Sequence, residues 1–272
     1  MNTIKNTPLA LVTGASRGIG RAIAETLAGA GYNLVLTCSR TLPELSGLAN
    51  SLEEKYGIHC TAQMADASDP VAMDQLFASL DHLDVLVNNA GISYIGLLTD
   101  MSIEEWQHII NTNLSSCFYT SRLAIPLMLQ KHSGRIINIS SVWGNVGASM
   151  EVAYSASKGG VNSFTKALAK ELAPSNIQVN AISCGVIDTA MNHCFSPEEM
   201  DALREEIPAA TIDGVKRRCN AGMGRCQGGF CGPRVLELIS RTRGIDPLDV
   251  LQDKAGSNVL LCETKQEGTN HD

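Results

Sequence analysis

Short apolar runs alternate with longer amphipathic stretches along roughly the first 190 residues of the chain. In the amphipathic stretches, apolar residues recur at helical spacing, as Ile19, Ile23 and Leu27 do. The apolar runs, which predict strands, cover residues 9–13, 33–37, 59–64, 83–87, 135–139 and 177–182. The amphipathic stretches, which predict helices, cover residues 18–30, 43–56, 70–80, 103–131 and 152–172, with a candidate kink at Pro126. Apolar strands separated by helices predict an α/β fold with a doubly wound parallel sheet.

The pattern changes near Pro208. Residues 213–233 are rich in Gly, Arg and Cys, and residues 235–243 and 247–253 have the pattern of two further helices. We therefore divide the chain into a main domain, a small irregular or helical Cys-containing segment and a tail that we expect to be disordered. These three parts are residues 1–210, 211–262 and 263–272.

Composition excludes several classes of protein. The chain has 272 residues, of which 44% are hydrophobic, so it can form a sizeable core and is neither a disordered chain nor a coiled coil. Its net charge of −7 disfavours a nucleic-acid partner, which needs a basic face. No apolar run approaches the ~18 residues of a membrane helix, and the N-terminus lacks the apolar stretch of a signal peptide. We expect a cytoplasmic protein without a membrane partner, whose nine cysteines are mostly buried thiols.

A glycine-rich turn joins the first predicted strand to the first predicted helix. Its spacing is Gly-x3-Gly-x-Gly over Gly14, Gly18 and Gly20. Glycines at such a turn let the backbone approach a pyrophosphate, which then binds at the helix N-terminus. The alternative is a tight strand–helix connection without a ligand. The candidate cofactor contacts in this turn are Gly14, Ser16, Arg17, Gly18, Ile19 and Gly20.

The end of the second strand indicates which dinucleotide is preferred. A site for NAD(H) typically has a carboxylate here for the ribose hydroxyls, whereas a 2′-phosphate needs cations. This strand end carries Ser39 and Arg40 and no acid, and Arg17 lies in the neighbouring turn. The charges favour NADP(H) over NAD(H). The alternative is that Arg40 is an ordinary solvated side chain.

Three further residues have the chemistry of carbonyl reduction. Tyr154 and Lys158 are four residues apart and share one face of a predicted helix. An ammonium favours the phenolate, so we expect Lys158 to lower the pKa of Tyr154, the proton donor. Ser141 follows a strand and can donate a hydrogen bond to the carbonyl oxygen. The alternative for the Tyr-x3-Lys pair alone is an ordinary amphipathic helix.

Together these residues resemble the short-chain dehydrogenase/reductase family over residues 7–210. The residues that carry the resemblance are Thr13–Gly20, Asp66, Asn88–Gly91, Asn113, Ser141, Tyr154 and Lys158. The resemblance implies a Rossmann-like fold, an oxidoreductase and a homo-oligomer. It also implies that Asp66 contacts the adenine, and that Asn113 holds a water that relays protons to Lys158.

The resemblance implies further cofactor contacts near the nicotinamide. They are Asn88, Ala90 and Gly91 after the fourth strand, Gly185, Ile187 and Thr189 after the sixth, and Tyr154 and Lys158 themselves. The family usually has Pro-Gly after the sixth strand, where this chain has Cys184-Gly185. That change keeps the glycine and loosens the turn.

Two subfamilies are the most similar. They are the 3-oxoacyl-[acyl-carrier-protein] reductases, which belong to fatty acid biosynthesis, and the elongation factor P 5-aminopentanone reductases. The segments Ser140–Gly144 and Gly147–Val152 resemble the second more than the first. The substrate is then a carbonyl compound carried on acyl carrier protein or on a modified protein lysine. Glu151 lies three residues before Tyr154 and favours a cationic amine, the alternative being an exposed loop acid.

The C-terminal part resembles a different family. Residues 213–233 are similar to the end of the bacterioferritin-associated-ferredoxin-like [2Fe-2S] module, through Cys226-x4-Cys231 and the nearby Cys219. A [2Fe-2S] cluster needs four ligands, and the module's other Cys-x-Cys pair is absent from this sequence. We expect neither a cluster nor another metal there. A fusion of two gene fragments is an open alternative, and we expect the sheet to lack its usual last strand.

These observations predict an NADPH-dependent reductase of a 3-oxoacyl thioester or an aminoketone, in which Asn113, Ser141, Tyr154 and Lys158 are catalytic. Two alternatives remain at this point. One is an iron–sulfur electron-transfer protein that uses Cys226 and Cys231, and the other is an inactive nucleotide-binding remnant.

Overall fold

The computed structural model describes residues 7–187, 189–192, 196–200, 231–246 and 249–250. The chain divides into two units, Met1–Cys194 and Phe195–Asp272. Each unit is described by itself.

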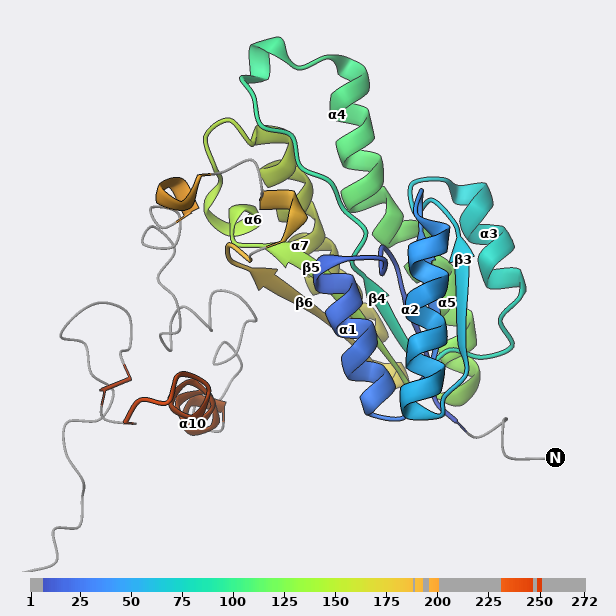
Figure 1. Ribbon diagram of the computed structural model, residues 1–272. Coiled ribbons are helices and arrows are strands. Elements are labelled where there is room, and N and C mark those ends of the chain that lie inside the picture. Colours follow the sequence, from blue (N-terminus) through green and yellow to red (C-terminus); the bar gives the residue numbers. More distant parts are fainter. Residues whose placement is uncertain (1–6, 188, 193–195, 201–230, 247–248, 251–272) are drawn as a thin grey trace, which may run out of the picture. The chain divides into compact units, whose positions relative to one another are not determined.

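The first unit contains a parallel sheet of six strands in the order β3-β2-β1-β4-β5-β6 (Figure 1). The strands are β1 (Leu9–Val12), β2 (Asn33–Cys38), β3 (Cys60–Met64), β4 (Val85–Asn88), β5 (Gly134–Ser141) and β6 (Ile177–Cys184). The helices are α1 (Gly18–Gly29), α2 (Leu42–Tyr56), α3 (Pro70–Ala78), α4 (Ile103–Ile110), α5 (Ser116–Lys131), α6 (Trp143–Val146) and α7 (Val152–Leu172). Short helical turns are η2 (Leu98–Asp100), η3 (Asn111–Ser115), η4 (Ala173–Ser175) and η5 (Ala190–Asn192). The predicted doubly wound α/β fold is confirmed.

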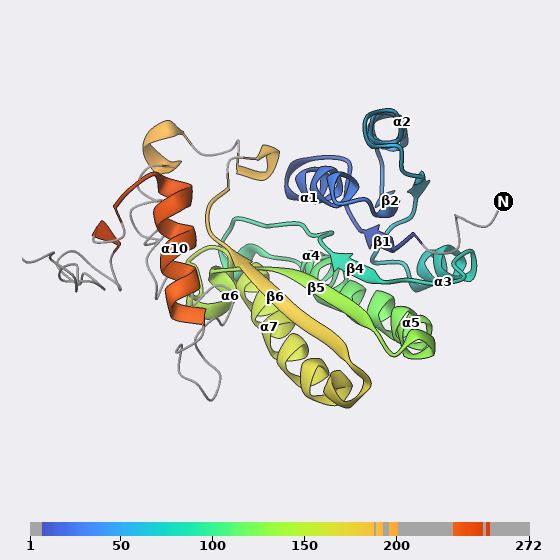
Figure 2. The same cartoon turned by 90° about the horizontal axis from the view of Figure 1, so that it is seen from below.

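Helices cover both faces of the sheet, as the apolar strands require. Figure 2 shows α1 and α2 on one face and α3, α5 and α7 on the other. Side chains of β1 alternate between the two cores: Ala10 and Val12 pack with α1 and α2, whereas Leu11 packs with the opposite helices. All three side chains are fully buried. The two cores hold the strand ends, and therefore the loops that follow them, in fixed positions.

One predicted helix is wrong in detail. Residues 103–131 form two helices, α4 and α5, joined by η3. The interruption is a π-helical turn at Asn111–Ser115, whereas Pro126 lies inside α5. Isolated π turns of this kind are frequent at functional sites. Here the turn contains Asn113.

The strand order reverses between β1 and β4, in the middle of the sheet. From β1 the chain moves outward to β2 and β3, and then returns to β4 on the other side of β1. Ligands of such sheets bind at this reversal, beyond the carboxyl ends of the strands. The loops after β1, β4, β5 and β6 therefore frame the candidate site.

Within the described residues, β6 is the edge of the sheet. Its residues alternate between buried and exposed positions, because α7 covers one of its faces. Residues 201–230 and 251–272 lie outside the described part, so the missing last strand stays a prediction.

The described residues of the second unit are helical for the most part. Ser196 and Glu199 form a reciprocal pair of side-chain to backbone hydrogen bonds at 2.8 and 3.2 Å. The helix α10 (Cys231–Arg243) includes the helix predicted at 235–243. Of residues 247–253 only Asp249 and Val250 are described, so the helix there stays a prediction, as does the disordered tail at 263–272.

Candidate active site

Three glycines shape the turn between β1 and α1. Gly14 and Gly18 have φ of +64° and +54°, where a side chain would be strained. A Cβ atom added at Gly20 would overlap the carbonyl oxygen of Gly14. Only glycine fits these positions, and the backbone of the turn is left open to a ligand.

The N-terminus of α1 is suited to an anion. Arg17 is its N-cap residue and makes no side-chain capping bond, and the first turn carries no acidic residue. The free N–H groups and the helix dipole at this end therefore favour a phosphate. The methyl group of Thr189 lies 3.4 Å from the place where a Cβ of Gly18 would be. The predicted contacts at the turn and at Thr189 are thus close together.

Thr13 and Asn89 carry the family resemblance but were not among the predicted contacts, and they hold the turn against the loop after β4. The Asn89 Nδ2 atom donates to the carbonyl oxygens of Thr13 and Gly14, both at 2.9 Å. The Thr13 hydroxyl accepts from the backbone N–H groups of Asn89 and Ala90 at 3.0 and 3.1 Å. In the sequence, each of them is a polar residue directly after a buried strand, and this pattern could have indicated their role. These two residues connect the two halves of the crevice.

The side chain of Asn88 takes part in a buried hydrogen-bond network. The side chain is buried, donates to Asn138 Oδ1 at 2.8 Å and accepts from the Thr120 hydroxyl at 2.6 Å. The Asn138 Nδ2 atom in turn donates to the Thr165 hydroxyl at 2.9 Å. We call Thr120, Asn88, Asn138 and Thr165 the amide network. Since it engages both ends of the Asn88 amide, the predicted cofactor contact is left to the Asn88 backbone.

Asn113 is buried and faces the loop after β4. Its Oδ1 atom accepts from the N–H of Ile92 at 2.8 Å, and its Nδ2 atom donates to the carbonyl of Ile92 at 2.9 Å. The same Nδ2 atom donates to the Ser157 hydroxyl at 3.0 Å. A Cβ added at Gly91 would lie 3.3 Å from Asn113 Oδ1 and 3.4 Å from Lys158 Nζ. Asn113, Gly91 and Lys158 therefore meet as predicted, while the water relay remains untested.

Tyr154 lies on α7 and is hydrogen-bonded to Ser141 at the end of β5. Burial raises the pKa of Tyr154 to about 12, an effect that the hydrogen bond with Ser141 opposes. The charges of Glu151 and Cys184 raise the pKa further. The phenol therefore holds its proton at neutral pH, which suits a proton donor.

Lys158 does not lower the pKa of Tyr154 in this structure, contrary to the expectation from their spacing. Its Nζ atom donates to the carbonyl oxygen of Ile139 at 2.8 Å and lies 5.8 Å from the centre of the Tyr154 ring. Burial lowers the pKa of Lys158 itself. The spacing brings the two side chains to one side of α7, but the amine is directed to the strand behind it.

The ends of β2 and β3 carry the remaining predicted contacts. Ser39 and Arg40 follow β2 and are exposed, as Arg17 is. In the part of the chain that the structure describes, neither arginine has an ion-pair partner. Asp66 is exposed beside the end of β2 and accepts two hydrogen bonds from Ser68, at 2.8 and 2.9 Å. This edge offers two free cations to a phosphate.

The last predicted contacts follow β6. The carbonyl of Cys184 accepts from the N–H of Val142 at 2.9 Å, which links the loops after β5 and β6. Gly185 is half-buried, and Ile187 is 43% exposed. Their loop therefore leads from Ser141 toward Thr189.

No group of three or more metal-ligating side chains occurs among the residues described. Cys219 and Cys226 lie outside them. Cys231 is the first residue of α10, with a side chain that is not described. The expectation that no cluster forms there stays a prediction. No helix in the described ranges is both long and apolar enough to cross a membrane.

A glycine turn on a doubly wound sheet, together with a Ser-Tyr-Lys arrangement at its crevice, defines a dinucleotide-dependent oxidoreductase. Residues 8–200 match the family described as short chain dehydrogenase. The chain belongs to this family, whose members bind NAD(P)(H).

Relatives of several activities are similar to the chain. The uncharacterized oxidoreductase YmfI of Bacillus subtilis is 42% identical over 75% of this chain and 84% of its own length. The 3-oxoacyl-[acyl-carrier-protein] reductase FabG of Escherichia coli is 39% identical over 78% of this chain and 87% of its own length. Among solved structures, acetoin dehydrogenase YohF from Salmonella typhimurium is 32% identical, with a TM-score of 0.65. The match covers 69% of this chain and 76% of the acetoin dehydrogenase chain.

Proposed function

We propose that the protein is an NADPH-dependent reductase that converts a ketone to an alcohol. The observation that carries the proposal is the convergence of Ser141, Tyr154, Lys158 and Asn113 at the crevice beside the glycine turn. When bound, the nicotinamide supplies the hydride. The described residues fit this cofactor, because the glycine turn leaves its backbone open and the N-terminus of α1 has free N–H groups.

Tyr154 gives its proton to the carbonyl oxygen. Its pKa of about 12 keeps that proton in place until negative charge develops on the oxygen during the reaction. Ser141 donates a hydrogen bond to the same oxygen and also favours the phenolate that is left. The two hydroxyls lie at the carboxyl end of β5 and on the first turn of α7, so the sheet and helix hold them in register.

Lys158 and Asn113 support the site. The buried amine of Lys158 would bind a ribose hydroxyl of the cofactor. Asn113 holds Ile92, and with it the loop after β4, through two hydrogen bonds. Asn113 is also the candidate holder of a water that relays protons to Lys158.

The cofactor preference follows from charge. Arg17 and Arg40 are exposed and, among the described residues, free of ion pairs, so a 2′-phosphate can bind both. Ser39 adds a hydroxyl donor, and Asp66 lies at the same edge for the adenine. No carboxylate follows β2 directly, which supports NADP(H) over NAD(H).

The substrate is a 3-oxoacyl thioester or an aminoketone. The relative named 3-oxoacyl-[acyl-carrier-protein] reductase supports the first, with acyl carrier protein as partner. Glu151, beside Tyr154, supports the second, which allows a modified protein lysine as the carrier. We propose a cytoplasmic homo-oligomer in either case.

The test is NADPH oxidation by the purified chain, followed by absorbance, with an acetoacetyl thioester and an aminoketone offered separately. We expect turnover with at least one ketone, and an alcohol product that mass spectrometry identifies. NADPH binding without oxidation by any ketone would contradict the proposal and favour a binding protein.

A further inference from the structure

Glu151 is a half-buried carboxylate at the entrance to the candidate site. It is the N-cap residue of α7 and precedes Tyr154 by three positions, near enough for its charge to raise the pKa of the phenol. Burial also raises the pKa of Glu151 itself. Burial therefore opposes the ionisation of Glu151, and the charge of Glu151 opposes that of Tyr154. The proton transfer proposed above makes no use of this carboxylate.

Two loops hold this carboxylate in place. Residues 92–98 and 146–152 are joined by a hydrogen bond from the Gly96 N–H to the Met150 carbonyl at 2.9 Å. The Ser93 hydroxyl donates to Glu151 Oε1 at 3.5 Å, the upper limit for such a bond. Because Asn113 fixes Ile92, the position of Ser93 is tied to the catalytic residues.

Glu151 has no ion-pair partner in the part of the chain that the structure describes. Among the described residues, its carboxylate has one hydrogen-bond partner, the neutral hydroxyl of Ser93 at 3.5 Å. Removing a carboxylate from water is costly unless a cation or several hydrogen bonds compensate. Beyond the N-terminus of α7, no cation among the described residues compensates this charge, so the carboxylate is available to a cationic group of a ligand.

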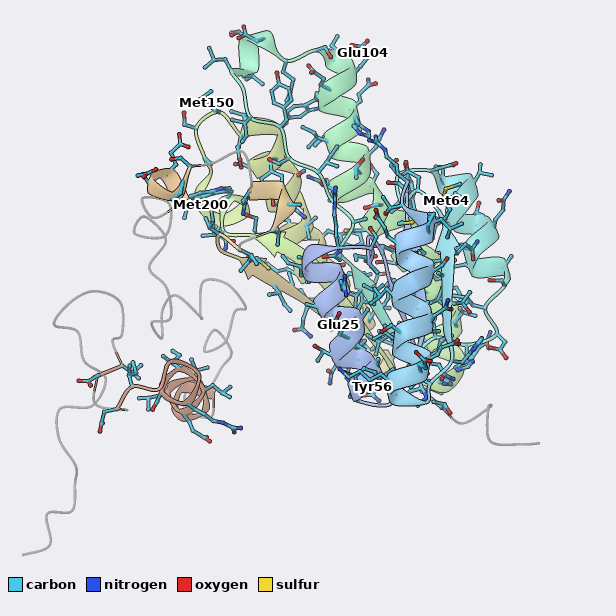
Figure 3. The ribbon with its side chains drawn as sticks, in the orientation of Figure 1. Glu25, Tyr56, Met64, Glu104, Met150 and Met200 are labelled. Atoms are coloured by element: carbon cyan, nitrogen blue, oxygen red, sulfur yellow. The ribbon has the colours of Figure 1, made fainter. Side chains whose placement is uncertain are left out.

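Apart from Glu151, the two loops carry no charge. Residues 92–98 and 146–152 contain no other charged side chain. Their exposed apolar side chains are between 42% and 65% accessible and include Ile95, Leu97, Val146, Met150 and Val152. Figure 3 marks Met150 on the loop that leads to α7. A ligand that matches this surface is apolar along its length and carries one positive charge near the reacting carbonyl.

We propose that Glu151 is a specificity-determining residue, which binds an ammonium group of the substrate and so selects amino ketones over neutral ketones. This inference rests on the proposed function. The ammonium pairs with the carboxylate, which removes the cost of its burial and its effect on Tyr154 at the moment the substrate binds. Neutral ketones gain no such contact and leave the charge unpaired.

The experiment compares two ketones that differ only in charge. One is a methyl ketone with a terminal dimethylammonium group, and the other is its neutral isostere, with C–H in place of N–H⁺. Pairs with two, three and four methylenes between carbonyl and nitrogen cover the unknown distance. The readout is the ratio of kcat/KM for the cationic ketone to that for the neutral one, with NADPH, in each protein.

The variant Glu151→Gln removes the charge but keeps an oxygen that can accept from Ser93. We expect the ratio to exceed one in the parent protein and to fall about tenfold or more in Glu151→Gln, between the effects of exposed and buried charge pairs. The matched control is Ser93→Ala, which removes the hydrogen bond but keeps the carboxylate. Its ratio stays close to that of the parent protein.

The outcomes separate this inference from the proposed function. If no ketone of either kind, acetoacetyl thioester included, is reduced, the proposed function fails. If neutral ketones are reduced and the ratio is the same in the parent protein and Glu151→Gln, the proposed function stands and the role of Glu151 is refuted. Equal falls in Glu151→Gln and Ser93→Ala would also refute it, because they would mean that Glu151 only links the two loops.

Discussion

At the scale of single residues, Tyr154 lies between a hydroxyl that stabilises its anion and a carboxylate that destabilises it. The hydrogen bond with Ser141 lowers the pKa of the phenol, while burial and Glu151 raise it. The result, about 12, describes a proton donor that stays protonated at every physiological pH. The protonated Tyr154 can therefore act as the general acid in ketone reduction. Oxidation of an alcohol requires the phenolate of Tyr154 instead and is favoured at high pH.

The variant Tyr154→Phe tests this assignment. The phenyl ring keeps the packing and removes the only proton that Tyr154 can give. We expect kcat for ketone reduction to fall by about 10²–10⁴-fold, while fluorescence titration still detects NADPH binding. A Tyr154→Phe protein with normal turnover would show that another group donates the proton.

Arg40 sets the preference between the two dinucleotides. The change Arg40→Asp replaces a cation suited to a 2′-phosphate with an anion suited to ribose hydroxyls. We expect the parent protein to bind NADPH more tightly than NADH, and Arg40→Asp to reverse or abolish the difference in Kd. The control Arg122→Asp on α5 makes the same change in net charge and should keep the preference. Equal Kd values for the two cofactors in the parent protein would contradict the argument.

Glu151 also predicts a pH-dependent stability. Its pKa is higher in the folded chain than its ordinary value, so folding favours the protonated form. Stability is therefore lost as the pH rises from the ordinary pKa of a glutamate through the raised pKa of Glu151 in the folded chain. Tyr154, which faces Glu151, stays neutral throughout because its pKa is about 12. We expect Glu151→Gln to have a higher Tm than the parent protein at pH 7 and an equal Tm at pH 3, by differential scanning fluorimetry. A lower Tm at pH 7 would mean that Glu151 stabilises the fold.

At the scale of elements, the sequence predicted most of the sheet and helices because apolar strands and amphipathic helices alternate without interruption. It failed at residues 111–115, since a π turn changes one hydrogen-bond spacing and leaves the apolar pattern almost intact. Ser141, Tyr154 and Lys158 could be chosen as candidates because each lies at a strand end or on one helix face. The direction of the Lys158 amine could not be predicted, because it depends on a backbone carbonyl 19 residues earlier in the chain. The hydrogen bonds of Thr13 and Asn89 were not predicted for the same reason.

The contact between α6 and α7 gives a prediction at this scale. A Cβ added at Gly144 would lie 2.6 Å from the carbonyl carbon of Lys158, which is backbone and cannot turn aside. We expect Gly144→Ala to lower the free energy of unfolding by about 1–3 kcal/mol and to reduce turnover, because α6 must move away from Lys158. Urea unfolding and NADPH oxidation measure the two effects.

Gly47, inside α2, is the matched control for Gly144. A Cβ there meets nothing within 4 Å, so Gly47→Ala should raise stability by roughly 0.5–1 kcal/mol through helix propensity. Similar free energies of unfolding for the two variants would show that α6 can move away from α7 without loss of stability.

At the scale of the whole molecule, the chemistry lies in the first unit. Every residue assigned a catalytic or cofactor role precedes position 190, within the family match at 8–200. Four cysteines follow it, at positions 219, 226, 231 and 262, but none of them form the Cys-x-Cys pair of the [2Fe-2S] module, so we expect no cluster there. The division of labour is a prediction, because Cys219 and Cys226 are outside the residues that the structure describes.

The double variant Cys226→Ser/Cys231→Ser tests that division. We expect it to bind NADPH as the parent protein does, and we expect elemental analysis of both proteins, purified without oxygen, to find no bound iron. About two irons per chain in the parent protein, lost in the double variant, would instead identify a cluster.

The amide network has a consequence for how the chain finds this structure. Strands β4 and β5 are rich in similar aliphatic residues, which pair almost equally well when one strand slides along the other. Asn88 lies directly opposite Asn138 in the observed pairing, and their side chains are hydrogen-bonded. A slide of two residues would keep the same faces buried but would break the hydrogen bond between the two amides in an apolar interior, at a cost of about 1–3 kcal/mol. It would also carry Ser141 about 6.6 Å from its place beside Tyr154. The buried asparagines thus favour the observed register of β4 and β5 over a register that packs as well but is misaligned.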